Sequence, residues 1–127
     1  MERCNPFDEL IQAARAVLHP RELTPSASAG SVAAALLTAE GHIYRGVCID
    51  VPCSMGFCAE HAAIAAMITA GESRVVRLVA LTETRVVPPC GRCREFLYQI
   101  NPRNLDCEIL LSDRTATLDE LLPDRWE

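Results

Sequence analysis

The chain has 127 residues, half of them apolar, and a formal net charge of −5. This length suits one compact domain with a single hydrophobic core, and the apolar content argues against a disordered chain. All twelve basic residues are arginine, and they form no basic block. Because polynucleotide binding relies on a basic face that neutralises phosphates, we expect a small-molecule partner and no nucleic acid.

The N-terminal segment Met1–Pro6 is polar and lacks the apolar core of a signal peptide. No apolar run approaches the roughly 18 residues needed to span a bilayer. We therefore expect a soluble, cytoplasmic protein with no membrane partner. The seven cysteines are an odd number without a secretion signal, which argues against a disulfide framework and favours metal binding or burial as small hydrophobes.

Apolar periodicity and turn residues divide the chain into helices and strands. The expected helices span 7–18, 58–70, 90–101 and 118–122, and the expected strands span 32–38, 42–50, 75–81 and 107–112. Segments 24–31 and 52–57 are rich in small and turn-forming residues and are expected to be loops. This order predicts helices layered on a sheet within one domain, residues 1–127.

The most informative motif is Pro89-Cys90-Gly91-Arg92-Cys93. The prolines favour a helix start at Cys90, and residues three apart face the same way on a helix. Both sulfurs can then bind one ion, at about 2.3 Å if it is zinc, and a helix N-terminus stabilises thiolates. Taken alone, this cysteine pair would fit a redox pair or two buried cysteines as well as it fits a metal site.

A second motif, Cys58-Ala59-Glu60-His61, stands where another helix is expected to begin after a loop. Cys58 and Glu60 can both approach an ion placed beyond that helix end. Three cysteine ligands with one open position are typical of a catalytic zinc, whose fourth ligand is water. A carboxylate that is not a ligand can move protons there. The alternative is that Glu60 only complements the helix dipole.

Together these motifs resemble the cytidine deaminase family of the three-cysteine zinc type, with its C-A-E…P-C-x-x-C signature. The resemblance runs from about Val32 to the C-terminus. Val32–Thr38 and Tyr44–Val47 resemble the family's first two strands, and Leu121–Pro123 followed by Trp126 resembles its C-terminal ending. It implies an α/β, three-layer helix–sheet–helix fold with a mixed sheet of about five strands.

The resemblance also implies the roles of individual residues. Zn²⁺ would be held by Cys58, Cys90 and Cys93, with Glu60 as the proton shuttle. Zinc-bound hydroxide would attack the carbon that bears the exocyclic amine of a small cytosine nucleoside or nucleoside analogue, and ammonia would leave. The backbone around Ala59 would help to bind the polar edge of the base.

The chain departs from the family where the substrate's sugar would bind. The family's asparagine and glutamate at the end of the second strand correspond to Cys48 and Asp50, which share one face of the strand. We expect both to contact substrate, although a thiol cannot replace the donor and acceptor of an amide. The aromatic residue that packs on the base corresponds to Gly30 or Ser31. Blasticidin S deaminases alter these positions too, so an antibiotic of that kind is the alternative substrate.

Further expectations concern assembly and charge. The resemblance implies a homotetramer in which Trp126 closes a neighbour's pocket. Three thiolates on a divalent ion leave a net charge of about −1. This charge would be offset by Arg92, by Arg94 or by a protonated His61, although His61 is favoured as a neutral core residue.

Two other functions compete with catalysis. One is a catalytically silent zinc-binding domain of the same fold, and the other is a thiol redox protein that uses Cys90 and Cys93. Glu60 favours an enzyme, because a purely structural zinc site needs no carboxylate.

Overall fold

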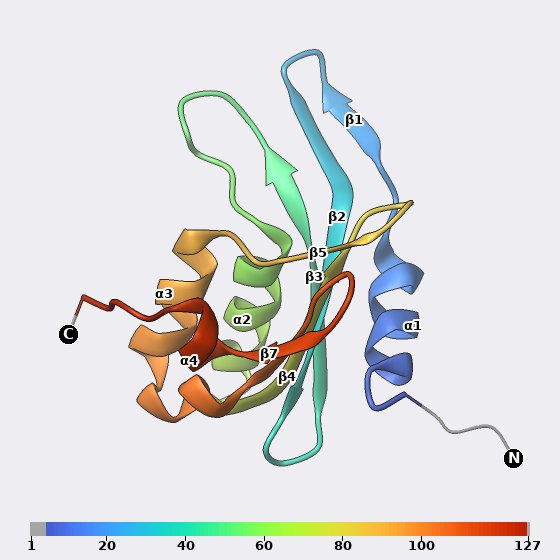
Figure 1. Ribbon diagram of the computed structural model, residues 1–127. Helices are drawn as coiled ribbons and strands as arrows, with labels where there is room; N and C mark the ends of the chain where they lie inside the picture. Colours follow the sequence, from blue (N-terminus) through green and yellow to red (C-terminus); the bar gives the residue numbers. More distant parts are fainter. Residues whose placement is uncertain (1–4, 127) are drawn as a thin grey trace, which may run out of the picture.

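The computed structural model describes residues 5–126 (Figure 1). Cys4, Glu127 and most of the polar N-terminal segment lie outside the described residues. No helix within the described range is both long and apolar enough to cross a membrane.

The helices lie on both faces of one sheet. Helix α1 (Asp8–Val17) covers one face, while α2 (Ala59–Thr69), α3 (Gly91–Ile100) and the short α4 (Leu118–Leu121) lie on the other (Figure 1). Each face has its own buried cluster, one centred on α1 and the other on α2 and α3. The three-layer helix–sheet–helix fold is therefore confirmed.

The sheet is mixed, as expected. Its central strand β2 pairs antiparallel with β1, β3 and β4, whereas β4 and β6 are parallel and β6 and β7 are antiparallel. The short β5 adds to the edge of β4. The described residues thus form seven strands rather than about five: β1 (Arg21–Thr24), β2 (Ala27–Thr38), β3 (Ile43–Asp50), β4 (Val75–Leu81), β5 (Val86–Val87), β6 (Glu108–Leu110) and β7 (Thr115–Thr117).

The expected loop over 24–31 is wrong. The chain forms a hairpin in which β1 pairs with the beginning of β2, and Ala29 has partners on both sides, Arg21 of β1 and Ile49 of β3. The small residues of this segment carry no alternating apolar pattern, so pairing with neighbouring strands determines its conformation. The expected strand 107–112 is also shorter, because a turn closed by the Leu111 N–H and the Arg114 carbonyl leads into β7.

Helix α2 packs closely on β3 because Gly46 has no side chain. A Cβ at this position would lie 2.7 Å from the backbone nitrogen of Ala63, which is far closer than packing allows. The β2 residue paired with Gly46 is also small: Ala34 is fully buried and packs with Ala59 of α2. This close approach fixes the position of the N-terminus of α2, where Cys58 and Glu60 lie.

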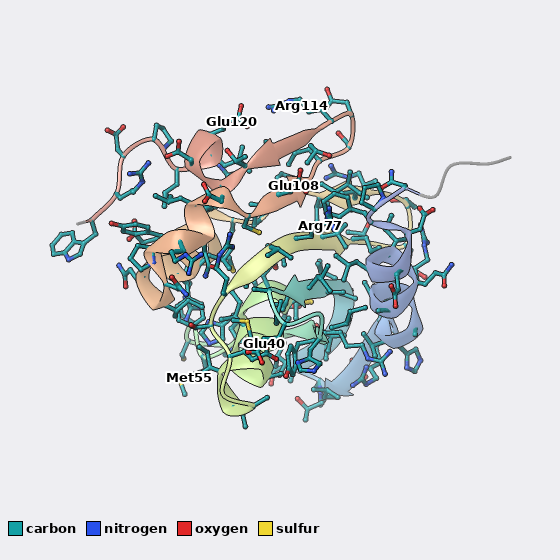
Figure 2. All side chains as sticks on the ribbon, turned by 90° about the horizontal axis from the view of Figure 1, so that it is seen from below. Glu40, Met55, Arg77, Glu108, Arg114 and Glu120 are labelled. Carbon is teal, nitrogen blue, oxygen red and sulfur yellow. The ribbon has the colours of Figure 1, made fainter. Side chains whose placement is uncertain are left out.

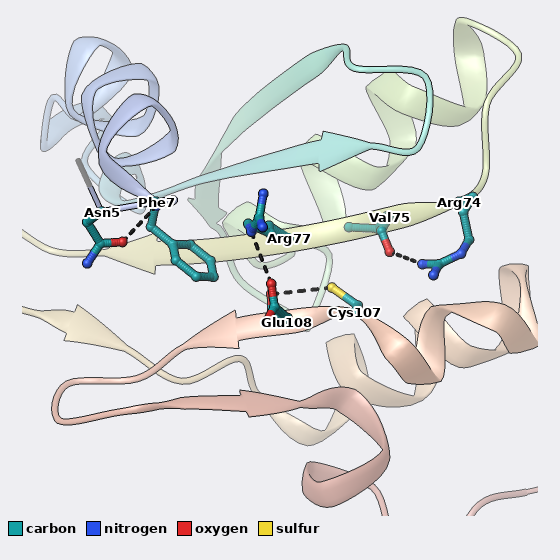
Figure 3. A network of polar contacts seen from close by, with 7 residues as sticks. All are labelled: Asn5, Phe7, Arg74, Val75, Arg77, Cys107 and Glu108. Carbon is teal, nitrogen blue, oxygen red and sulfur yellow. Dashed lines mark hydrogen bonds and ion pairs between the residues drawn. The ribbon is translucent and has the colours of Figure 1, made fainter. Parts of the chain in front are cut away.

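The parallel strands β4 and β6 are joined by side chains as well as by backbone pairing. Arg77 Nε donates to Glu108 Oε1 at 3.1 Å (Figure 2). Cys107 packs beside them with its thiol against the Glu108 carbonyl (Figure 3). Cys107 is fully buried, and burial raises the pKa of its thiol to about 12. It is a core residue and does not belong to the group of three neighbouring cysteines.

Candidate active site

Two helix N-termini meet at one place in the structure. Cys58 is the N-cap of α2 and Cys90 is the N-cap of α3; both have extended backbones and neither makes a side-chain capping bond. Their Sγ atoms lie 3.4 Å apart. Cys93, in the first turn of α3, is fully buried, and the three sulfurs all lie within 4.8 Å of one another. The structure therefore brings the three predicted ligands together.

The chemistry of this donor set fits a soft divalent cation. Burial raises the pKa of the Cys58 thiol to about 11 and also raises the pKa of Cys93. For Cys90, burial is outweighed by hydrogen bonds from the Cys93 backbone and the neighbouring thiols, which lower the pKa. Three adjacent thiols therefore need a nearby positive charge before all of them ionise. Zinc supplies that charge, and tetrahedral thiolate coordination is its usual structural chemistry.

Glu60 lies beside the three sulfurs. It is the second residue of α2 and only 4% exposed, and burial raises the pKa of its carboxyl. No ion pair neutralises it within the described part of the chain. A buried carboxyl whose pKa is raised holds a proton more readily than an exposed glutamate does, as a general acid requires.

A cavity of about 470 Å³ opens at this cluster. Its walls include Cys58, Cys90 and Glu60, together with three predicted substrate contacts, Cys48, Asp50 and Ala59, the last of which is fully buried. This volume lies in the range of small-molecule sites.

Trp126, the fourth predicted substrate contact, is not in this cavity. It lines a separate hollow beside Tyr98 and Pro102, and it is 78% exposed. Within a single chain the structure therefore does not bring Trp126 to the cysteine cluster.

Cys48 is held by polar groups in the cavity wall. Its Sγ lies 3.3 Å from Ser31 Oγ and accepts from the Val32 N–H at 3.3 Å. Its thiol donates in turn to Asp50 Oδ2 at 3.7 Å. Cys48 is only 6% exposed, whereas Ser31 and Asp50 are exposed. Ser31 and Asp50 therefore present polar atoms to a ligand, and Cys48 connects them.

Sequence reasoning missed the contribution of the loop that follows β3. Val51 and Ser54 line the cavity, and the loop is closed at its base by backbone hydrogen bonds between Ile49 and Phe57. Cys53 and Ser54 both have left-handed backbones, with φ of 62° and 58°. Neither residue type signals this conformation, which normally favours glycine. Cys53 is exposed and is not part of the three-sulfur group.

His61 and the two arginines occupy different environments. The His61 ring stacks between Phe57 and Phe96, at centroid distances of 4.9 and 4.8 Å, and burial together with the charge of Arg92 lowers its pKa. This supports the interpretation of His61 as a neutral residue. Arg94 donates to two backbone carbonyls, while Arg92 lines the cavity. Of the three groups, Arg92 is therefore the one placed to offset negative charge.

Comparisons with known proteins agree with this geometry. A family model described as "Cytidine and deoxycytidylate deaminase zinc-binding region" matches residues 8–108. A cytidine deaminase of Halalkalibacterium halodurans is 33% identical over 131 residues, which cover 97% of this chain and 92% of the relative. One from Mycobacterium tuberculosis is 32% identical over 100 residues, covering 76% of this chain and 72% of the relative.

Solved structures give the same result. The crystal structure of cytidine deaminase from Mycobacterium leprae superposes with a TM-score of 0.80 at 25% identity, covering 95% of this chain and all of the other. The enzyme from Mycobacterium tuberculosis gives a TM-score of 0.80 at 26% identity, covering 98% and 99% of the two chains. The chain therefore belongs to the cytidine and deoxycytidylate deaminase family of zinc-dependent aminohydrolases.

Proposed function

We propose that this protein hydrolytically deaminates a cytosine nucleoside or a nucleoside analogue, and that residues 1–127 act as one zinc domain. One observation carries the proposal: a buried glutamate lines the same small-molecule cavity as Cys58 and Cys90, whose sulfurs cluster with that of Cys93 beneath them. Zinc-binding thiols alone would fit a structural site, but a structural site has no use for an uncompensated buried carboxyl.

Cys58, Cys90 and Cys93 are the proposed zinc ligands. A zinc ion held by them supplies a Lewis acid that lowers the pKa of a water molecule. The starts of α2 and α3 direct backbone N–H groups toward the same point, and this favours the thiolate form of the two N-cap cysteines. Arg92, at the cavity wall, offsets the remaining negative charge.

Glu60 is the proposed general acid and base. It accepts a proton from the attacking water and gives it to the ring nitrogen of the base. It then takes the remaining proton from the hydroxyl group that water has added to the ring carbon and passes it to the exocyclic amine. The C–N bond breaks, the added oxygen becomes a carbonyl, and ammonia leaves. Burial raises the pKa of Glu60, and this favours the protonated form that the transfer to the base requires.

The substrate is proposed to lie with its base at the sulfur cluster and its sugar side toward Ser31 and Asp50. The backbone at Ala59, the first residue of α2, faces the cavity and is the proposed contact for the polar edge of the base. Asp50 is the proposed acceptor for a sugar hydroxyl. Cys48 offers less to a sugar than an amide would, because its thiol is already bonded within the wall.

The experiment that tests this proposal is an ammonia-release screen of the zinc-loaded protein. The substrates are cytidine, deoxycytidine, free cytosine, blasticidin S and aminated purines. Release from a cytosine nucleoside or its analogue supports the proposal, with the deaminated product identified by mass spectrometry. Zinc-loaded protein that releases ammonia from none of these substrates would instead identify a catalytically silent zinc-binding domain.

A further inference from the structure

An aromatic stack joins the starts of the two helices that carry the cysteine motifs. The His61 ring of α2 lies between Phe57, which precedes that helix, and Phe96 of α3. The interplanar angle is 36° with Phe57 and 15° with Phe96, so the latter two rings are nearly parallel. All three side chains are half-buried. The stack thus connects α2 with α3, which lie side by side on one face of the sheet (Figure 1).

Each end of the stack belongs to a segment of the candidate active site. Phe57 lines the cavity and directly precedes Cys58. Its backbone is bonded to Ile49 of β3 in both directions, at 3.0 Å each. Phe96 follows Cys93 by three residues on α3, a spacing that places both on one side of the helix. The stack therefore links the loop wall of the cavity to the helix that carries two of the proposed zinc ligands.

Before a metal binds, polar contacts contribute little to holding the two helix starts together. Within residues 5–126, the first turns of α2 and α3 share no hydrogen bond or ion pair other than the contacts among the three sulfurs. Those contacts become repulsive once the thiols ionise. A stacked aromatic pair is not weakened by this ionisation, and it shifts an equilibrium by about two- to tenfold. The stack is thus suited to keep the sulfurs close until the metal binds.

We propose that His61 is a positioning residue whose ring holds the zinc site and the adjoining cavity wall in place by stacking between Phe57 and Phe96. It acts through the two faces of the ring, because neither ring nitrogen is hydrogen-bonded to another described residue. A histidine that donated to a ligand sulfur would act through a nitrogen instead. This inference rests on the proposed zinc ligands and is independent of which substrate is deaminated.

Zinc affinity, measured by competition with a chelator, tests the proposal without turnover. His61→Ala should bind zinc about tenfold more weakly than the wild type, because it breaks both stacked pairs. His61→Phe should stay within about twofold of the wild type, since it keeps a ring and removes both nitrogens. The matched control is His19→Ala, the same substitution at an exposed position, and it should bind zinc as the wild type does. Equal zinc affinity in His61→Ala and the wild type, or equal loss in His61→Ala and His61→Phe, overturns the proposal.

Steady-state kinetics at saturating zinc give a second readout. Bound zinc then holds the helix starts together, so kcat of His61→Ala should remain close to that of the wild type. KM should rise by about fivefold, the order expected for one stacked pair, because Phe57 in the cavity wall loses its support. His61→Phe should restore KM. A fall in kcat in both variants with KM unchanged would assign His61 to the chemistry and contradict a positioning role.

Phe96→Leu tests the other end of the stack, because leucine keeps the apolar contact and removes the ring face. It should also weaken zinc binding, and adding His61→Ala should weaken it little further, since the two residues act through one stack. Fully additive losses would overturn the proposal. Wild-type protein that binds no zinc would overturn the proposed ligands together with this inference, whereas tight binding that is insensitive to His61→Ala counts against this inference alone.

Discussion

Gly46 of β3 and Ala62 of α2 touch so closely that a Cβ on Gly46 would lie 2.5 Å from the Ala62 Cβ. We expect Gly46→Ala to push α2 away from the sheet and to lower the free energy of unfolding by about 1–3 kcal/mol, the usual cost of overpacking. Urea denaturation measures this change. Gly91→Ala is the control, because a Cβ there meets nothing within 4 Å. Equal midpoints for the two variants would contradict this account of the packing.

The bound metal is the second prediction. Purified protein should contain about one zinc per chain by elemental analysis, as expected for three thiolates and one open position. Alanine at Cys58, Cys90 or Cys93 should release the metal and lower the free energy of unfolding, because zinc binding contributes on the order of 10 kcal/mol to folding in small zinc domains.

The matched control for the metal prediction is Cys53→Ala, which removes an exposed cysteine of the adjoining loop. It should keep full zinc content. If instead the Cys58→Ala protein keeps its zinc while Cys53→Ala loses it, the ligand assignment is wrong.

The role of Glu60 as proton shuttle can be tested by replacing its carboxyl with an amide of similar size, which cannot exchange protons in the same way. Glu60→Gln should keep its zinc and its fold, while kcat falls by roughly 10²–10⁴-fold or more, the usual contribution of a general acid and base. Steady-state kinetics on the best substrate and a zinc assay on the same sample separate the two effects. Near-normal turnover with zinc retained would exclude Glu60 from the chemistry.

The residue pattern predicted the long elements and the cysteine motifs, because both depend on local spacing. Helix α1 shows regular apolar periodicity, and the two cysteine motifs stand at helix starts. Strands β1, β5 and β7 were missed, since they are short and exist only through pairing with neighbouring strands. The contact between Ser31 and Cys48, 17 positions apart, depends on strand register, which single-sequence spacing does not specify.

The hydrogen bonds that the Glu72 carboxylate accepts predict how the free energy of unfolding depends on pH. Hydrogen bonds from Thr38, Tyr44 and His42 hold the pKa of the Glu72 carboxyl at about 2, despite burial that opposes ionisation. Because this folded-state pKa lies below the ordinary value of 4.5, the stabilisation is fully present above about pH 4.5 and is lost as the pH falls toward 2. Urea midpoints of the wild type should therefore fall over this window.

Glu72→Gln removes the ionisable carboxylate and so tests directly whether it is the source of this pH dependence. The variant should be less stable than the wild type at pH 7, and the difference should shrink as the pH is lowered through this window. Glu9→Gln, at an exposed position of α1, is the control and should follow the wild type. A stability difference between Glu72→Gln and wild type that is constant from pH 7 to pH 2 would rule out this source of acid sensitivity.

The last prediction is a homotetramer whose active sites are completed across subunits. Arg125 holds the C-terminal segment in place through the Leu122 carbonyl, Asp119 and the face of the Tyr98 ring, yet Trp126 beside it is 78% exposed. A large aromatic side chain displayed from an anchored segment suits burial by another subunit. Native mass spectrometry should show four chains at micromolar concentration.

Removal of residues 126–127 should raise KM with zinc retained, because a neighbour's cavity loses one wall. The control is Leu23→Ala, which trims another exposed apolar side chain and should leave KM unchanged. Mixing the truncated protein with Glu60→Gln under conditions of subunit exchange should then restore activity, since intact C-terminal segments would serve intact catalytic centres. The mixture should exceed the summed activity of its two components. A strictly monomeric protein, or a truncation without effect on KM, would show instead that each chain works with its own cavity alone, and that Trp126 has no part in substrate binding.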